Sequence, residues 1–309
     1  MENVSESMKK ILASKHLNDN FDKLVTAVKQ DPEITDFVKE HQSELASDAV
    51  ERSIAKLYEF YNVKQKNAHQ EKTFAPGYLP HLVVNDRLID IIYSASPEVQ
   101  ARQKELAQKR LITTVLMPKD VQDANLENFF SDDGNKSDVL DAAIDFIDEF
   151  NASPDTFHQG LYLYGHYGVG KTYLLGAIAN KLSEWGVQTT LVHFPSLAVE
   201  MKAAISDNSV ASKIDSIKKS SVLMIDDIGA DSMSSWVRDD ILGVILEYRM
   251  QQQLPTFFSS NFSMEKLEDE HLRVTQHGDN EPLKAGRLME RIRFLSRPVE
   301  MDGPNRRLH

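Results

Sequence analysis

A glycine-rich segment, residues 165–172, places the strongest constraint on the fold of this 309-residue chain. It reads Gly-His-Tyr-Gly-Val-Gly-Lys-Thr, which matches the pattern G-x-x-x-x-G-K-[ST]. A short apolar run, residues 161–164, precedes it, and apolar residues recur at helical spacing over residues 174–182. The glycines Gly165, Gly168 and Gly170 permit a tight turn whose N–H groups converge on phosphate oxygens. We therefore expect a strand, a phosphate-binding loop and a helix, in this order.

The side chains that end this segment suit the chemistry of a triphosphate. The positive ammonium of Lys171 would contact the β and γ phosphates, and the hydroxyl of Thr172 would be a ligand of Mg²⁺. A second apolar run, residues 221–225, ends in the acids Asp226 and Asp227. Acids at the carboxyl end of a strand lie where open α/β sheets bind ligands. We expect Asp226 to hold Mg²⁺ and Asp227 to polarise the water that attacks the γ-phosphate.

Two further groups of residues are candidates for the same site. Asn261 follows the apolar run 256–260, where its amide suits contact with the attacking water or the γ-phosphate, but equally an ordinary turn or helix cap. Arginines gather near the carboxyl end. Their fork matches phosphate oxygens, so they suit phosphoryl transfer or a nucleic-acid backbone, and the alternative is a solvated basic face. They are Arg287, Arg291 and Arg293 on one predicted helix, then Arg297, Arg306 and Arg307.

The pattern of apolar residues divides the chain into two domains. Residues 1–100 are predicted to form a small, mainly helical domain with a hairpin at 82–93. Residues 101–135 are predicted to be a linker, because residues 97–111 look helical and the sequence after residue 113 is acidic and irregular. Residues 136–309 alternate strands with helices, and the five apolar runs are 161–164, 189–194, 221–225, 256–260 and 298–301. This alternation predicts a five-stranded parallel sheet with helices on both faces, an α/β fold.

Composition excludes several classes of protein. The chain has no cysteine, which excludes disulfides and every zinc site built on Cys ligands. A net charge of −12 argues against a protein that coats nucleic acid by bulk electrostatics. No apolar stretch approaches the roughly 20 residues of a membrane span, and the polar amino terminus does not resemble a secretory signal. We expect a cytoplasmic protein.

Together these features resemble those of the AAA+ ATPases and, within that class, the bacterial primosomal helicase loaders of the DnaI and DnaC type, most closely the DnaI type. The resemblance lies in residues 165–172, 222–240, 254–261 and 287–293. It extends over the whole chain, because a helical amino-terminal domain followed by a linker also fits. It implies an ATP-dependent loader that places the hexameric replicative helicase on single-stranded DNA during primosome assembly in DNA replication.

The resemblance also implies a role for individual residues. Asn261 would be the sensor I residue, Arg291 the arginine finger that reaches a neighbouring subunit's nucleotide, and Arg306 sensor II. The amino-terminal domain would grip the helicase, and subunits would self-associate to supply the finger. The resemblance implies that ATP and Mg²⁺ bind at one site, where Thr172 and Asp226 are the metal ligands. The residues of this site would be Gly165, Gly168, Val169, Gly170, Lys171, Thr172, Tyr173, Asp226 and Arg306.

Three departures from the family pattern qualify these expectations. Asp227 stands where these proteins most often have glutamate, so hydrolysis should be weak unless a partner or DNA stimulates it. The short chain after Arg291 leaves no room for the usual carboxyl-terminal helical lid. Amino-terminal domains of the DnaI type can hold zinc through cysteines, and this chain has none. Zinc is therefore not expected, because His69 and His81 lack other evident ligands.

Alternative functions share the same nucleotide machinery. One is an AAA+ helper of a transposase or a replication initiator, which the partner of the amino-terminal domain would distinguish. Another is an ATP-gated adaptor that scarcely hydrolyses its nucleotide. DNA binding is expected to be weak and non-specific, through the basic tail and the lysines of residues 196–219.

Overall fold

The structure is a computed structural model that describes residues 23–69, 71, 73, 75–115, 121–129, 136–230, 233–273, 278 and 280–306. The chain divides into two compact units, residues 1–104 and residues 105–309. Helix α6 (Pro97–Leu111) contains the division. Residues 1–22 of the predicted helical domain lie outside the described residues.

The first unit is a small helical domain with one β-hairpin. Its helices are α3 (Pro32–Glu40), α4 (Ala49–Arg52) and α5 (Ile54–Ala68), and residues 23–29 are also helical. Strands β1 (Tyr78–Asn85) and β2 (Leu88–Ala95) pair antiparallel, which confirms the predicted hairpin. The core is formed by Val28, Ile34, Leu45, Ala49, Leu57, Phe60 and Ile89. Apolar packing therefore holds this cysteine-free unit together, as its sequence requires.

The second unit is built on a parallel sheet in the order β3-β5-β6-β7-β4-β8. Five strands correspond to the five apolar runs: β4 (Gly160–Tyr164), β5 (Thr189–His193), β6 (Val222–Asp226), β7 (Thr256–Ser260) and β8 (Ser296–Glu300). The predicted number of five is wrong by one, because β3 (Ile112–Val115) adds a sixth strand at the edge beside β5. This strand lies in the stretch that the sequence predicted to be a linker.

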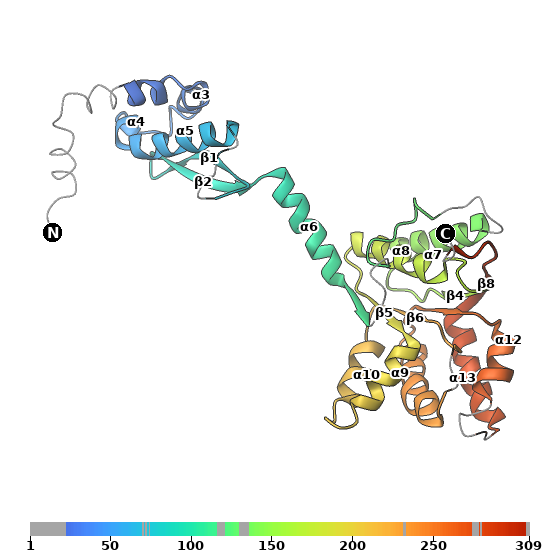
Figure 1. Cartoon of the computed structure of the whole chain (residues 1–309). Helices are drawn as coiled ribbons and strands as arrows, with labels where there is room; N and C mark the ends of the chain where they lie inside the picture. The colour runs from blue at the N-terminus through green and yellow to red at the C-terminus, as the bar shows by residue number, and fades with distance from the viewer. Residues whose placement is uncertain are drawn as a thin grey trace. The chain divides into compact units, whose positions relative to one another are not determined.

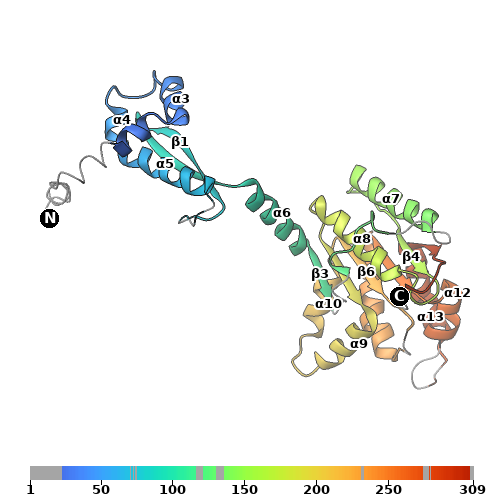
Figure 2. The ribbon, with the colours of Figure 1, turned by 45° about the horizontal axis from the view of Figure 1, so that its top comes forward.

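Helices cover both faces of this sheet, as expected for an α/β fold (Figures 1 and 2). Leu161 and Leu163 of β4 pack in one core with α7 (Lys136–Ala152) and α8 (Lys171–Glu184). Tyr162, between them, packs in the other core. That second core contains residues of α9 (Phe194–Ala203), α10 (Val210–Lys218), the π-helix η2 (Val237–Leu242), α11 (Gly243–Gln251), α12 (Met264–Lys266), the π-helix η3 (Leu267–Leu272) and α13 (Pro282–Leu295). The alternation of side chains along β4 thus fixes which helices lie on which face.

Local signals set the ends of two helices in the second unit. The N–H of Val237 donates to the Ser234 hydroxyl at 3.3 Å, so Ser234 caps the helical residues 235–236 that lead into η2. Helix α8 ends before Gly186, which has a φ of 81°. At the carboxyl edge of the sheet, the end of β4 leads into the start of α8. The candidate site lies at this edge.

Candidate functional site

The phosphate-binding loop joins β4 to α8, as its motif predicts. Its three glycines have positive φ values, 154° for Gly165, 78° for Gly168 and 105° for Gly170. Gly170 is the N-cap of α8, and Lys171 is the first residue of that helix. The free N–H groups of the first turn of a helix, together with its dipole, favour an anion at this point. The loop can therefore receive a phosphate group.

Lys171 is buried, with 7% of its surface exposed, and its ammonium is fully engaged within the chain. It donates to the carbonyls of Gly165 at 2.8 Å and His166 at 2.9 Å, and to Oδ1 of Asn261 at 2.9 Å. These oxygens occupy positions around the ammonium that phosphate oxygens would take. A bound triphosphate would therefore exchange partners with Lys171 rather than meet a free charge.

Thr172 and Asp226, which the sequence predicts to be ligands of Mg²⁺, lie next to each other in the structure. The Thr172 hydroxyl lies 3.0 Å and 3.1 Å from the two carboxylate oxygens of Asp226. Burial raises the pKa of the Asp226 carboxyl, against hydrogen bonds from Ser259 and Thr172 that favour its charged form. Oxygen donors of this kind fit Mg²⁺, which takes few protein ligands and completes its coordination with phosphate and water.

Ser259 is a site residue that sequence reasoning missed. Its hydroxyl donates to Asp226 and accepts the backbone N–H of Asp227 at 3.0 Å. The register pairs Ile225 of β6 with Phe258 of β7, which places the next residue of each strand side by side. A serine near the end of an apolar strand was the available signal, but its use required knowing that these two strands are neighbours.

Asn261 hydrogen-bonds to both Asp227 and Lys171. Its Nδ2 donates to Oδ1 of Asp227 at 3.0 Å, while its Oδ1 accepts from Lys171. Asp227 has a φ of 61°, a left-handed conformation that aspartate tolerates better than most residues. His193, which the sequence did not single out, lies with Nε2 4.0 Å from Oδ2 of Asp227. The side chains of Asp227, Asn261 and His193 thus lie close together at the carboxyl edge of the sheet.

A segment from the predicted linker packs beside the loop. The Tyr173 hydroxyl accepts the N–H of Asn125 at 3.2 Å, and the Tyr173 ring stacks on Phe129 with centroids 6.5 Å apart. Val169 is buried in the core that also contains Phe129. Residues 121–129 therefore belong to the surroundings of the site, which their acidic and irregular sequence did not predict.

The residues after β8 cross the phosphate loop. The N–H of Met301 donates to the Tyr164 carbonyl at 2.6 Å, and the N–H of Arg306 donates to the Gly168 carbonyl at 3.0 Å. The loop glycines make this approach possible, since a Cβ on Gly165 would lie 2.0 Å from the Met301 carbonyl oxygen. The structure thus brings Arg306 to the loop, whereas Arg307 lies outside the described residues.

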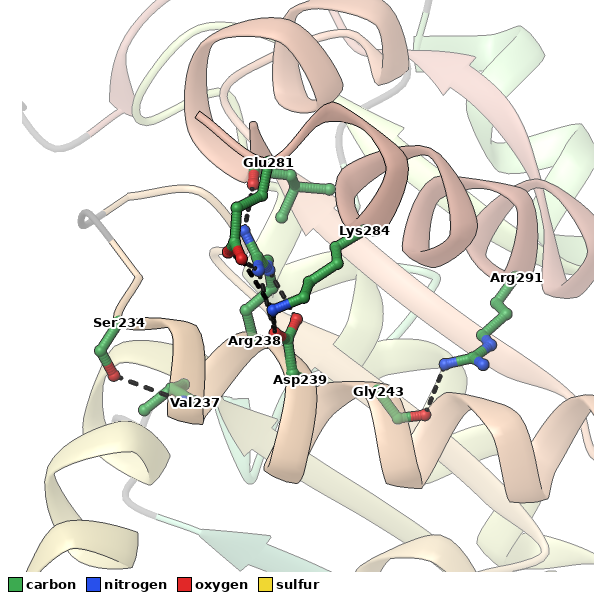
Figure 3. Close-up of polar contacts among 9 residues, drawn as sticks. Ser234, Val237, Arg238, Asp239, Gly243, Glu281, Lys284 and Arg291 are labelled. Atoms are coloured by element: carbon green, nitrogen blue, oxygen red, sulfur yellow. Dashed lines mark hydrogen bonds and ion pairs between the residues drawn. The ribbon is translucent and has the colours of Figure 1, made fainter. Parts of the chain in front are cut away.

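Arg291 contacts a different part of the same chain. Its Nη1 donates to the Gly243 carbonyl at 3.0 Å (Figure 3). Its Nη2 forms an ion pair with Glu247. On the same helix, Arg293 pairs with Glu268 at 2.8 Å. The described contacts of Arg291 therefore lie on α11, and not on the phosphate loop of its own chain.

The lysines considered for DNA binding are mostly paired with acids. Lys213 forms an ion pair with Glu200, and Lys218 and Lys219 both pair with Asp215, at 3.1 Å and 2.6 Å. These pairs reduce the positive charge that α9 and α10 offer to a phosphate backbone.

Two other predictions concern membranes and metals. None of the described helices has the length and apolar character needed to cross a bilayer. His69 and His81 are both exposed, and His81 bonds to the Ser94 hydroxyl at 2.7 Å.

Comparisons with known proteins match both halves of the chain. The family model of the primosomal protein DnaI N-terminus matches residues 1–93, and that of the IstB-like ATP binding protein matches residues 93–308. The replicative helicase loader DnaI of Bacillus subtilis (strain 168) is 36% identical over 312 residues, 99% of each chain.

Two solved structures resemble the chain at higher identity over a shorter length. A crystal structure of DnaI is 44% identical with a TM-score of 0.57, and covers 64% of this chain and 98% of that one. A putative primosome component from Streptococcus pyogenes serotype M3 is 40% identical with a TM-score of 0.55, over 66% of this chain and 100% of that one.

Proposed function

Because the chain belongs to the DnaI family of helicase loaders, as its sequence indicated, we propose that it loads a hexameric replicative helicase onto single-stranded DNA. This step would use ATP and would occur during primosome assembly in DNA replication. The observation that carries the proposal is the similarity over 99% of both chains to a replicative helicase loader. The match of residues 1–93 to the DnaI amino-terminal family supports the loader over a transposase helper or an initiator, because the expected difference between them lies in this domain.

ATP would bind at the phosphate loop. Lys171 would leave the carbonyls of Gly165 and His166 and take phosphate oxygens in their place. Thr172 and Asp226 would hold Mg²⁺, which neutralises negative charge on the phosphates. The apolar surroundings of Val169 and Tyr173 would hold the loop in shape.

Hydrolysis would depend on groups at the edge of the sheet. Asp227 would accept the proton of the attacking water, and Asn261, which already bonds to Asp227, would orient that water. Arg306 would sense the nucleotide from the segment that crosses the loop. Arg291 would complete the site of a neighbouring subunit, where it stabilises the charge that develops on the transferred phosphoryl group. Turnover should therefore be weak in a dilute single chain.

Two partners follow from this proposal. The amino-terminal unit would bind the helicase, and single-stranded DNA would bind weakly and without sequence preference. An ATP-gated adaptor with little hydrolysis differs from the loader only in phosphate release.

Co-purification tests the partner. The full chain should retain the hexameric replicative helicase of the same cell, and a chain lacking residues 1–93 should not. A full chain that fails to retain the helicase, with or without ATP, would refute the proposed function.

Phosphate release tests the nucleotide chemistry. ATP turnover should rise when helicase and single-stranded DNA are added, and Lys171→Ala should abolish it. Lys181→Ala is the matched control, because Lys181 lies on the same helix but pairs with Glu184 at 2.7 Å on the surface. Turnover that stays absent in the wild-type chain with both partners would leave the adaptor as the function.

A further inference from the structure

Arg291 is anchored at both ends of its guanidinium. Nη1 donates to the Gly243 carbonyl at 3.0 Å, and Nη2 pairs with the Glu247 carboxylate, which also accepts Nε2 of Gln251 at 2.7 Å. Figure 3 shows the Arg291 side chain extending from α13 to the first residue of α11. Two elements distant in sequence thus define where this guanidinium lies.

A second set of contacts holds α13 against η2, the element before α11. Arg238 of η2 is buried and bonds to Asp239 at 2.7 Å, to the Leu272 carbonyl at 3.0 Å and to Glu281 (Figure 3). Lys284 of α13 pairs with Asp239 at 3.1 Å and with Glu281 at 2.7 Å. This network ties the start of α13 to η2, directly before α11. Glu247 therefore acts on Arg291 from a fixed position.

The anchoring leaves part of the guanidinium available. A guanidinium has five N–H groups, and the two contacts of Arg291 use one on each terminal nitrogen, so about three remain. The Arg291 side chain is 25% exposed, whereas that of Arg238 is 2% exposed and surrounded by its partners. Arg238 thus serves the packing of the chain. Arg291 is oriented by Glu247, and its remaining N–H groups can donate to a group outside the chain.

We propose that Glu247 is a positioning residue for Arg291, which it holds in the orientation that reaches the nucleotide of a neighbouring subunit. This inference rests on the proposed function, in which Arg291 acts in trans. A free arginine side chain has many rotamers, and it loses part of that freedom whenever it binds a phosphate. Glu247 and the Gly243 carbonyl impose that order before the subunits meet, which lowers the barrier for the transfer step.

The charge of Glu247 is the quantity to change. Glu247→Gln keeps the size of the side chain and removes its charge. A partly exposed ion pair contributes up to about 1 kcal/mol, so the kcat stimulated by helicase and DNA should fall about fivefold. The KM for ATP should stay at the wild-type value, because the chain that binds the nucleotide is intact. Glu268→Gln is the matched control, since it removes the partner of Arg293 on the same helix and should leave kcat unchanged.

A second variant separates positioning from a general structural role. Arg291→Ala should abolish most of the stimulated turnover, and adding Glu247→Gln to it should cause no further loss, because Glu247 acts only through Arg291. A further loss in the double variant would overturn the inference. So would wild-type kcat for Glu247→Gln alongside a slow Arg291→Ala chain. Full turnover by Arg291→Ala would instead remove the trans role from the proposed function, and this inference with it.

Mixing two variants completes the test. A Lys171→Ala chain binds no nucleotide but keeps a correctly held Arg291, so it should restore turnover to the Glu247→Gln chain in the same assembly. A misfolded nucleotide site in Glu247→Gln could not be restored in this way. Failure of the mixture to exceed Glu247→Gln alone would overturn the inference.

Discussion

Gly165→Ala should destabilise the second unit much more than Gly186→Ala does. Both glycines have positive φ values, 154° and 81°. A Cβ on Gly165 would lie 2.0 Å from the backbone oxygen of Met301, whereas a Cβ on Gly186 would have no neighbour within 4 Å. Gly186→Ala therefore measures the conformational cost alone, and Gly165→Ala adds the cost of moving the segment that follows β8.

The structure sets the size of the difference. Alanine in a left-handed conformation costs about 1–2 kcal/mol, which is the full effect expected for Gly186→Ala. Moving Met301 also strains its hydrogen bond to the Tyr164 carbonyl, about 1 kcal/mol, and exposes part of a side chain that is only 1% exposed, roughly 1 kcal/mol more. Gly165→Ala should thus cost about 3–4 kcal/mol.

Urea denaturation followed by tryptophan fluorescence measures this difference directly. The chain has two tryptophans, Trp185 and Trp236, and both lie in the second unit, so the signal reports on that unit alone. If Gly165→Ala and Gly186→Ala have the same free energy of unfolding, the described approach of Met301 to the phosphate loop does not hold in solution.

Three further predictions concern other parts of the chain. Arg249→Met should lower the stability of the second unit by about 3–5 kcal/mol in the same denaturation assay, because three carbonyls, two of them in buried bonds, lose their donor, and a loss under about 1 kcal/mol would contradict this. Burial lowers the pKa of His271 below its ordinary 6.5, so the unfolded chain binds more protons just below that pH and stability is lost on acidification. His271→Phe keeps the ring contact with Phe262 and should reduce the loss of unfolding free energy between about pH 7.5 and about pH 5; an unchanged loss would refute this attribution. Asp31→Ala should speed hydrogen exchange in the first turn of α3 by removing a cap worth about 1 kcal/mol, while Asp36→Ala, on the same helix, should not; equal exchange rates in the two variants would contradict the cap.

The phosphate loop and the five strands from β4 to β8 were predictable because their signals are local. A contiguous motif specifies the loop, and runs of buried residues specify strands such as β6. The short β3 escaped prediction because it has only four residues, two of which are threonines.

The contacts within the site were less predictable because they depend on the order of strands. Ser259 and His193 reach Asp226 and Asp227 from the two strands beside β6. Periodicity identifies strands but not their neighbours. The same reason explains Glu247, whose pairing with Arg291 depends on how α11 packs against α13.

The strand order has a consequence for synthesis on the ribosome. β4, which leads into the phosphate loop, pairs only with strands made later: Tyr162 lies beside Phe258 of β7 and beside Pro298 of β8. The hairpin of the first unit pairs neighbouring segments, so that unit can fold while translation continues. In the second unit, β4 has no neighbouring strand until residues 256–260 are made, and it gains its second neighbour only with residues 296–300. The phosphate loop therefore takes its final place late in the folding of this unit.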